Sequence, residues 1–326
     1  MPADPSSLQA SPMSAGLATA PIDGIAALAH FGLLKFTGAD VQTFLQGQVS
    51  CDVGGLQRWQ AIYGSYNTPK GRMLATFLLW RDDTGYAMQL PRSLCEPIRR
   101  RLSMYVLRSK VSIHDAGDGY ELLGAVGSAA KTHIARLFPD APAQTLTMTS
   151  GLGASLLRLD DERFLIVVQR GHALREELTA GLAAVSPEIW DWTNIRAGIP
   201  YITPATQDQF VPQMANLDLI NGVSFSKGCY PGQEIVARMH YLGKLKQRMY
   251  LASTEGEVPQ PGDKLYSPGT GEQSTGMVVN SAAGPDGRHA MLAVMHIDSF
   301  NAGEVHLRSP AGARLVFTDL PYAVPA

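Results

Sequence analysis

Hydrophobic and polar positions in the first third of the chain alternate in a way typical of paired β-strands. An apolar run covers residues 73–80, and a second covers residues 86–90. Between them stands Asp82-Asp83-Thr84-Gly85, a sequence rich in turn-forming residues. Two apolar runs joined by a short polar turn predict a β-hairpin.

The polar and apolar pattern then changes to a helical period. Ser93 and Glu96 have the spacing of a capping box, so we expect a helix to begin there. Its apolar residues recur every three or four positions and predict one buried stripe, formed by Leu94, Ile98, Leu102 and Tyr105. Cys95 lies off this stripe, so we expect an ordinary helix residue near the helix start.

From residue 120 onward the order of expected elements is strand, helix, strand, strand, helix. The helices are predicted over residues 128–138 and 171–184, and the last two strands over 154–159 and 163–168. This order is typical of a split βαβ, ferredoxin-like unit. A further helix should begin with Ser186 as N-cap and Pro187 at its first position, and end at Gly198.

After about residue 246 the apolar runs become short and alternate with Pro, Gly and Asp turns. The runs cover residues 248–252, 276–279 and 290–296. Short strands at this spacing predict a small all-β barrel. The expected fold is therefore α+β, with an α+β body over residues 21–245 and a C-terminal β-barrel over 246–326.

Composition narrows the class of protein. The length of 326 residues favours two or three domains. The net charge of −2 gives no overall electrostatic attraction to nucleic acid. No apolar run reaches the roughly 18 residues that a membrane span needs. Residues 1–20 contain no Lys or Arg, which argues against a targeting segment. We expect a disordered tail there and a cytoplasmic protein that contacts neither membrane nor nucleic acid directly.

The three cysteines, Cys51, Cys95 and Cys229, lie far apart in the sequence. No Cys-x-x-Cys or zinc-type spacing occurs, so neither a disulfide framework nor a resident zinc site is expected. A complete four-thiolate iron–sulfur site is impossible with three cysteines. A shared or transient cluster remains open.

The strongest candidate for chemistry is the segment 227–234, Lys-Gly-Cys-Tyr-Pro-Gly-Gln-Glu. Pro231 suits the first turn of a helix, which would place Cys229 just before exposed N–H groups. The helix dipole and the ammonium of Lys227 both favour the thiolate of Cys229 as nucleophile or soft-metal ligand. Gln233 and Glu234 are expected to tether this turn. The alternative interpretation is a small buried residue in a tight turn.

This segment resembles the signature of the YgfZ family, relatives of the glycine-cleavage T-protein, an aminomethyltransferase. Residues 37–49 and 194–200 are similar to further segments of that family. The resemblance implies a T-protein-like arrangement of three units around an opening that holds folate. It also implies that the body over residues 21–245 consists of two intertwined subdomains. It also gives signature positions around the thiol, namely Gly228, Tyr230, Gly232, Gln233 and Glu234.

The resemblance further implies tetrahydrofolate or a derivative as cofactor. The family's folate-contacting tryptophan matches Trp190, and a second aromatic contact matches Phe31. Trp190 and Trp192 point about 200° apart on a helix, so only one can face a pocket while the other packs. Arg196 departs from the family, because relatives carry Glu there and arginine offers no acceptor to a pterin. Arg196 as a surface residue is the alternative.

A cationic loop precedes the hairpin. Asn67, Lys70 and Arg72 form it, and they suit the anionic tail of folate, although a solvated turn explains them equally well. T-proteins carry a catalytic pair of aspartates where this chain has Leu74 and Ala75, which cannot move protons. We therefore expect no T-protein catalysis.

The function expected from the resemblance is that of a folate-binding accessory protein. It would support assembly or repair of iron–sulfur clusters in client enzymes, including tRNA-modifying ones, with Cys229 acting by redox exchange or transient ligation. Its partners would be client or assembly proteins and folate. The alternatives are a folate-dependent one-carbon transferase and a non-catalytic docking module.

Overall fold

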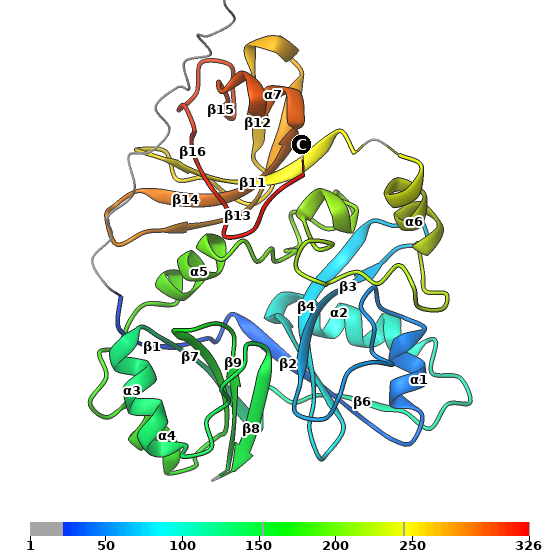
Figure 1. Cartoon of the computed structure of the whole chain (residues 1–326), viewed down its shortest axis with the longest axis vertical. Coiled ribbons are helices and arrows are strands. Elements are labelled where there is room, and N and C mark those ends of the chain that lie inside the picture. Colours follow the sequence, from blue (N-terminus) through cyan, green and yellow to red (C-terminus); the bar gives the residue numbers. More distant parts are fainter. Residues whose placement is uncertain (1–21, 152, 244, 326) are drawn as a thin grey trace, which may run out of the picture.

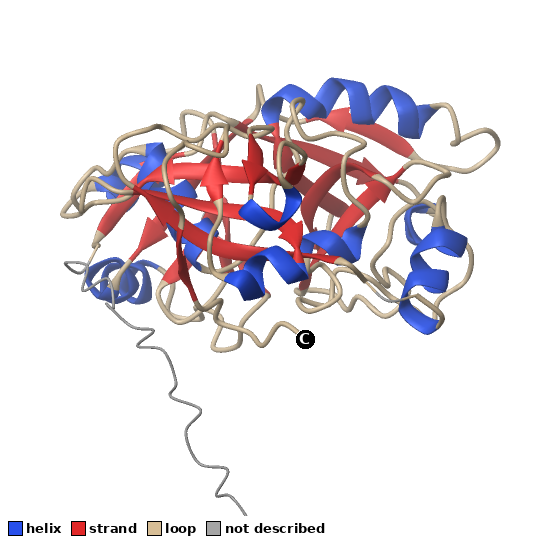
Figure 2. Ribbon diagram, turned by 90° about the horizontal axis from the view of Figure 1, so that it is seen from above, coloured by secondary structure: helices blue, strands red, loops and turns tan. Residues whose placement is uncertain are grey.

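A computed structural model describes residues 22–151, 153–243 and 245–325, and the expected tail over residues 1–20 lies outside them. Three β-sheets form the molecule (Figure 1). Figure 2 shows the strands gathered in the middle with most helices around them. No helix within the described residues is long and apolar enough to cross a membrane.

The first sheet is antiparallel and has the strand order β3-β4-β5-β2-β6. Its strands are β2 (Phe31–Thr37), β3 (Ala61–Asn67), β4 (Met73–Arg81), β5 (Tyr86–Pro91) and β6 (Ser112–Asp115). Helices α1 (Val41–Gln46) and α2 (Arg92–Ser103) belong to the same unit. The predicted hairpin is confirmed, since β4 and β5 pair with Trp80 opposite Ala87.

Helix α2 differs from the prediction at both ends. It begins at Arg92 with Pro91 as N-cap, and Glu96 bonds Arg99 and Arg100 instead of completing a capping box. Cys95 is buried, because α2 lies so close to β2 that a Cβ on Gly32 would meet the Cys95 sulfur. Tyr105 lies beyond the helix end and is 48% exposed, so the stripe ends at Leu102.

The second sheet is antiparallel, in the order β1-β7-β10-β9-β8. Its strands are β1 (Gly24–Ala27), β7 (Tyr120–Val126), β8 (Thr147–Gly151), β9 (Ala154–Arg158) and β10 (Arg163–Gln169). The helices are α3 (Ser128–Leu137) and α4 (Leu174–Thr179). The predicted elements all occur and follow one another as expected, except that β8 stands between α3 and β9. Helix α4 is shorter than expected, because its C-cap Ala180 is extended and Gly181 follows at a φ of 79°. Strands β1 and β8 were not predicted.

Helix α5 (Pro187–Arg196) lies between the second and third sheets (Figure 1). Its start is confirmed, with Ser186 as N-cap and Pro187 in the first turn. Both tryptophans are buried, Trp190 at 1% exposure and Trp192 at 7%. Trp190 packs at Gly124 of the second sheet, whereas the Trp192 ring lies at Gly284 beside the third. The opposite faces of the helix thus join two sheets.

The third sheet has the order β15-β12-β13-β14-β11-β16. Its strands are β11 (Gln247–Thr254), β12 (Lys264–Tyr266), β13 (Ser274–Ala283), β14 (His289–His296), β15 (His306–Leu307) and β16 (Val316–Thr318). This unit also contains helix α7 (Ile297–Ala302) and the short 3₁₀ helix η2 (Pro268–Thr270). Another short 3₁₀ helix, η1 (Pro212–Ala215), lies in the chain between α5 and the third sheet. Main-chain bonds from Leu307 to Ala313 and from Leu315 to Val305 link β15 to the segment that continues into β16. The sheet therefore curls back on itself. The sequence predicted a small all-β barrel here, and a curled sheet is the part of that prediction that the structure shows.

Candidate thiol site and central cavity

The turn that carries Cys229 precedes helix α6 (Gln233–Tyr241). The helix begins at Gln233, and Gly232 is its N-cap with a left-handed φ of 80°. Pro231 was expected in the first turn of this helix but lies two residues before it, because the left-handed Gly232 separates the two. Cys229 is exposed and lies four residues before the helix.

Lys227 ties this turn to the first unit of the fold. Its Nζ donates to the carbonyl of Val49 at 2.7 Å and to that of Cys51 at 2.8 Å. The ammonium also lies 5.1 Å from the ring centroid of Tyr230. Burial lowers the pKa of Lys227 to about 8. The lysine thus holds two main-chain segments together at the cost of desolvating a charge.

Two glycines fix the other side of the turn. A Cβ on Gly232 would lie 2.4 Å from the Cα of Gly71, and Gly71 has a φ of 74°. Only residues without a Cβ allow this approach. Gln233 completes the support, since its Nε2 donates to the carbonyl of Lys227 at 3.2 Å. Glu234 lies in the first turn of α6, whereas Gly228 faces open space.

The structure brings the predicted cationic loop against this turn, since Gly71 stands between Lys70 and Arg72. The Nη1 of Arg72 donates to the carbonyl of Gln209. Asn67, at the end of β3, is buried, and its amide has no hydrogen-bond partner among the described residues. The thiol turn and the loop therefore form one surface feature.

The three cysteines lie in very different surroundings. Cys51 and Cys95 are buried, and burial raises the pKa of each thiol to about 12. Cys229 is exposed. Within the residues that the structure describes, no group of three or more His, Cys, Asp or Glu side chains is placed to hold a metal ion.

The two aromatic residues proposed to contact folate both lie in the hydrophobic core between the first and second sheets. Phe31 is buried, with its ring centroid 4.7 Å from that of Tyr201. Trp190 is buried as well, and its Nε1 has no hydrogen-bond partner in the described part of the chain. Neither residue lies at the thiol turn.

Arg196 lines a different feature, a cavity of about 530 Å³ at the end of α5, called the central cavity below. Its walls come from β3, from the strand ends at residues 159–163, from the end of α5 with the segment that follows it, and from the C-terminal segment. They include Tyr63, Leu159, Arg163, Arg196, Ile199 and Pro321. Sequence reasoning missed Arg163 and Tyr63, although a charge at the start of the apolar run 163–168 was a usable signal.

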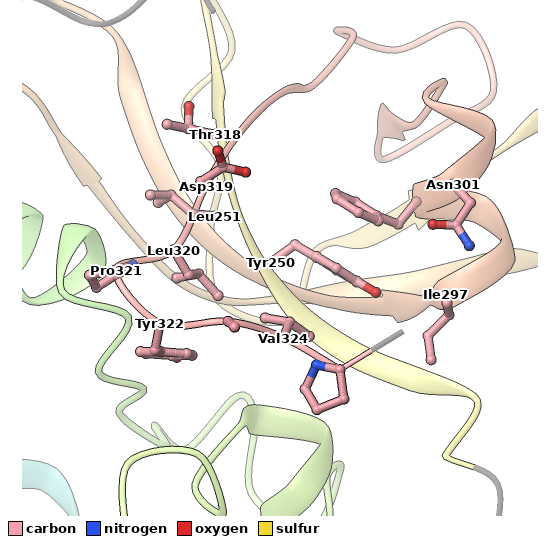
Figure 3. Close-up of a pocket in the computed structure, with 13 residues that line it drawn as sticks. Tyr250, Leu251, Ile297, Asn301, Thr318, Asp319, Leu320, Pro321, Tyr322 and Val324 are labelled. Atoms are coloured by element: carbon pink, nitrogen blue, oxygen red, sulfur yellow. The ribbon is translucent and has the colours of Figure 1, made fainter. Parts of the chain in front are cut away.

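A second cavity, of about 420 Å³, lies between the third sheet and the C-terminal segment (Figure 3). Tyr250, Ile297 and Asn301 line one side of it. Tyr322 turns away from Asn301 toward the segment after α5, where its hydroxyl donates to the carbonyl of Gly198 at 2.8 Å. The C-terminal segment is thereby fastened beside the central cavity.

The fold matches a solved structure closely. The glycine cleavage system aminomethyltransferase T from Bartonella henselae superimposes with a TM-score of 0.74 over 91% of this chain and 85% of that one, at 14% identity. This likeness shows the fold, a mixed α+β aminomethyltransferase T architecture. No family model matches the chain.

Relatives in sequence define the family. The tRNA-modifying protein YgfZ of Yersinia pestis (strain Pestoides F) is 34% identical over 303 residues, which cover 91% of this chain and 92% of the relative. The protein of the same name from Shigella boydii serotype 4 matches to the same extent. The chain belongs to the YgfZ family.

Proposed function

We propose that this chain is a folate-binding accessory protein that supports assembly or repair of iron–sulfur clusters in client enzymes, including enzymes that modify tRNA. The observation that carries the proposal is the exposed thiol of Cys229 on a turn held by Lys227 and by the approach of Gly232 to Gly71. A thiol positioned by a rigid main chain is suited to chemistry with a partner. Its relatives named as tRNA-modifying proteins support the client class.

The role proposed for Cys229 is transient ligation. The thiol loses its proton to water, and the thiolate sulfur gives a lone pair to an iron of a cluster in transit, with no change of oxidation state. Cys51 and Cys95 are buried, so the other ligands of such a cluster would come from a client or assembly protein. In this proposal a cluster comes from one protein bound at the turn and passes to a client protein.

Folate binding is proposed for the central cavity. Its volume of about 530 Å³ lies in the range of small-molecule sites, and apolar walls suit a flat ring. Two of the polar groups that line it, Arg163 and Arg196, are donors only and therefore fit the acceptor and anionic parts of folate. Phe31 and Trp190 lie in the core nearby, and Asn67, Lys70 and Arg72 at the thiol turn, so any direct contact from them stays a prediction.

A one-carbon transferase is the less favoured function. Leu74 and Ala75 occupy β4, and neither side chain can accept or donate a proton. We propose a cytoplasmic protein whose partners are proteins and folate rather than nucleic acid or membrane.

The proposal is tested by rescue of a bacterium that lacks its own YgfZ protein, with the activity of a cluster-dependent tRNA-modifying enzyme as readout. We expect the wild type to restore activity and Cys229→Ser to fail. Ser226→Ala is the matched control, since it removes a hydroxyl from the same turn. Equal rescue by Cys229→Ser would remove the thiol from the mechanism, and no rescue by the wild type would refute the client class.

A further inference from the structure

Two arginines, Arg163 and Arg196, line the central cavity, and the chemistry proposed for Cys229 does not involve them. We propose that Arg163 and Arg196 form an anion subsite there, which takes the carboxylate of a flat aromatic ligand. This inference rests on the proposed small-molecule role of the cavity and deepens it by stating which end of the ligand faces inward.

Arg163 is the fixed member of the pair. It is only 6% exposed, although it carries a permanent charge. Its Nε donates to Asp160 Oδ2 at 2.5 Å and its Nη1 to Asn194 Oδ1 at 2.8 Å. These two acceptors fix the plane of the guanidinium. The third nitrogen, Nη2, has no hydrogen-bond partner among the residues described, and Arg163 lines the cavity.

Arg196 is the second member and is the last residue of α5. Its guanidinium lies 5.2 Å from the Trp192 ring centroid, a cation–π contact that positions the group without consuming its N–H donors. Arg196 also lines a small neighbouring cavity, together with Trp192 and Asp286. Within residues 22–151, 153–243 and 245–325 the cation–π contact is the one interaction of its side chain. Five donors are therefore free for a ligand.

The local charge favours an anion. Asp160 also lines the cavity, but its oxygens already accept from the Arg163 side chain and from the main-chain N–H groups of Glu162 and Arg163. Burial opposes ionisation of Asp160, yet the Arg163 charge and these bonds outweigh it, so its pKa is lowered. Asp160 thus neutralises Arg163, whereas no ion pair to Arg196 occurs among the described residues.

The remaining walls define the rest of the ligand. Leu146, Leu159, Ile199, Ile220 and Pro321 give apolar surface, and Tyr63 adds an aromatic ring. A guanidinium pair beside apolar walls selects a molecule with a flat ring and a carboxylate. A ligand that presents only N–H donors to Arg196 could form no hydrogen bond with it, because arginine is itself only a donor. Leaving donors on both sides without acceptors in a cavity costs free energy.

Two flat probes separate the possibilities, 4-aminobenzoylglutamate, which carries carboxylates, and 6-hydroxymethylpterin, which is neutral. We expect calorimetric titration of the full chain to show binding of 4-aminobenzoylglutamate. Arg196→Glu should weaken it by about 10- to 100-fold, the usual effect of losing a charge-assisted bond. Arg314→Glu is the matched control, because it makes the same charge change on a side chain outside this cavity and should leave binding unchanged.

The proposed subsite predicts weaker binding of 4-aminobenzoylglutamate in Arg196→Glu, and the opposite change would contradict it. Tighter binding of 6-hydroxymethylpterin than of 4-aminobenzoylglutamate, with a gain on Arg196→Glu, would overturn the subsite, as would no binding of either probe to the wild type. Should Arg196→Glu fail to fold by circular dichroism, Arg196→Gln gives the same test, with weaker binding expected. Cys229→Ser should bind the probes as the wild type does, so failure of the thiol role and failure of the subsite are separable.

Discussion

Cys51 and Cys229 lie close to the same hydrogen bond, yet one thiol is buried and the other is exposed. Lys227, two residues before Cys229, donates to the carbonyl of Cys51. Cys51 is completely buried, and burial raises the pKa of its thiol to about 12. Cys229 stands in solvent on a turn that the same lysine holds in place. The contact made by Lys227 therefore has an inert, buried thiol on one side and an accessible thiol on the other.

This difference shows that position in the main chain, not residue type, decides what a cysteine can do. The turn at Cys229 is specified by groups that leave its sulfur free: a lysine bonded to carbonyls and two glycines in contact. The Cys51 sulfur lies against Gly64 in the core. Measurements on the two residues side by side test this difference between them.

The largest expected effect is on alkylation. Buried thiols react only from opened states, which are populated at roughly 10⁻³ or less, so Cys51 and Cys95 should react at least about 1,000-fold more slowly than Cys229. Timed labelling with iodoacetamide in native buffer, followed by peptide mass spectrometry, measures the three rates. Comparable rates for Cys51 and Cys229 would contradict the burial of Cys51.

The next effect concerns the glycine contact behind the turn. Gly232→Ala should lower the free energy of unfolding by about 2–4 kcal/mol, because a left-handed residue gains a Cβ that meets Gly71 and the carbonyl of Thr68. Urea unfolding measures this change. Gly228→Ala is the matched control and should change stability by less than about 0.5 kcal/mol, since a Cβ at residue 228 meets open space. Equal effects of the two variants would argue against the close approach.

A smaller effect is expected from serine at the two cysteines. Cys51→Ser should destabilise the protein by about 1–3 kcal/mol, because it buries a hydroxyl in an apolar site. Cys229→Ser should stay within about 0.5 kcal/mol of the wild type. Thermal and urea unfolding of both variants give the answer, and a large loss for Cys229→Ser would make the turn residue structural.

The smallest effect is a pH dependence from Lys227, because its side chain is partly exposed and solvent screens much of the charge effect. Its pKa is about 8 in the folded protein against a usual value of 10.5, because burial disfavours the charge. Between these two values the unfolded chain binds the proton more strongly, so stability rises with pH. In Lys227→Met this contribution disappears. Urea unfolding from pH 7 to pH 10 should show the wild type gaining relative to the variant, and parallel curves would contradict a buried ammonium.

The sequence predicted the elements whose boundaries are set by local chemistry. The hairpin at Asp82–Gly85 and the start of α5 at Ser186-Pro187 follow from turn and capping residues alone. The errors lie where packing decides. Cys95 is buried because α2 lies against Gly32, a contact between distant segments that no helical period reveals.

The candidate site divides in the same way. The thiol turn was visible as a motif, since its residues are contiguous over 227–234. The carbonyls that Lys227 contacts lie near residue 50, and the cavity joins residues from 63 to 321. Such long-range groupings depend on the fold, and Arg163 in particular reads in sequence as the polar start of an ordinary strand.

Strand β1 has a consequence for the order in which the protein acquires structure during biosynthesis. β1 pairs with β7 from Gly24 opposite Val126 to Ala27 opposite Leu123, so the whole first sheet is inserted between two neighbouring strands of the second. The earliest strand to leave the ribosome must therefore wait, unpaired, for about one hundred residues of chain to follow. Residues 31–115 can form their own strand pairs during that delay, and β1 can pair with β7 before β8, β9 and β10 have been synthesised.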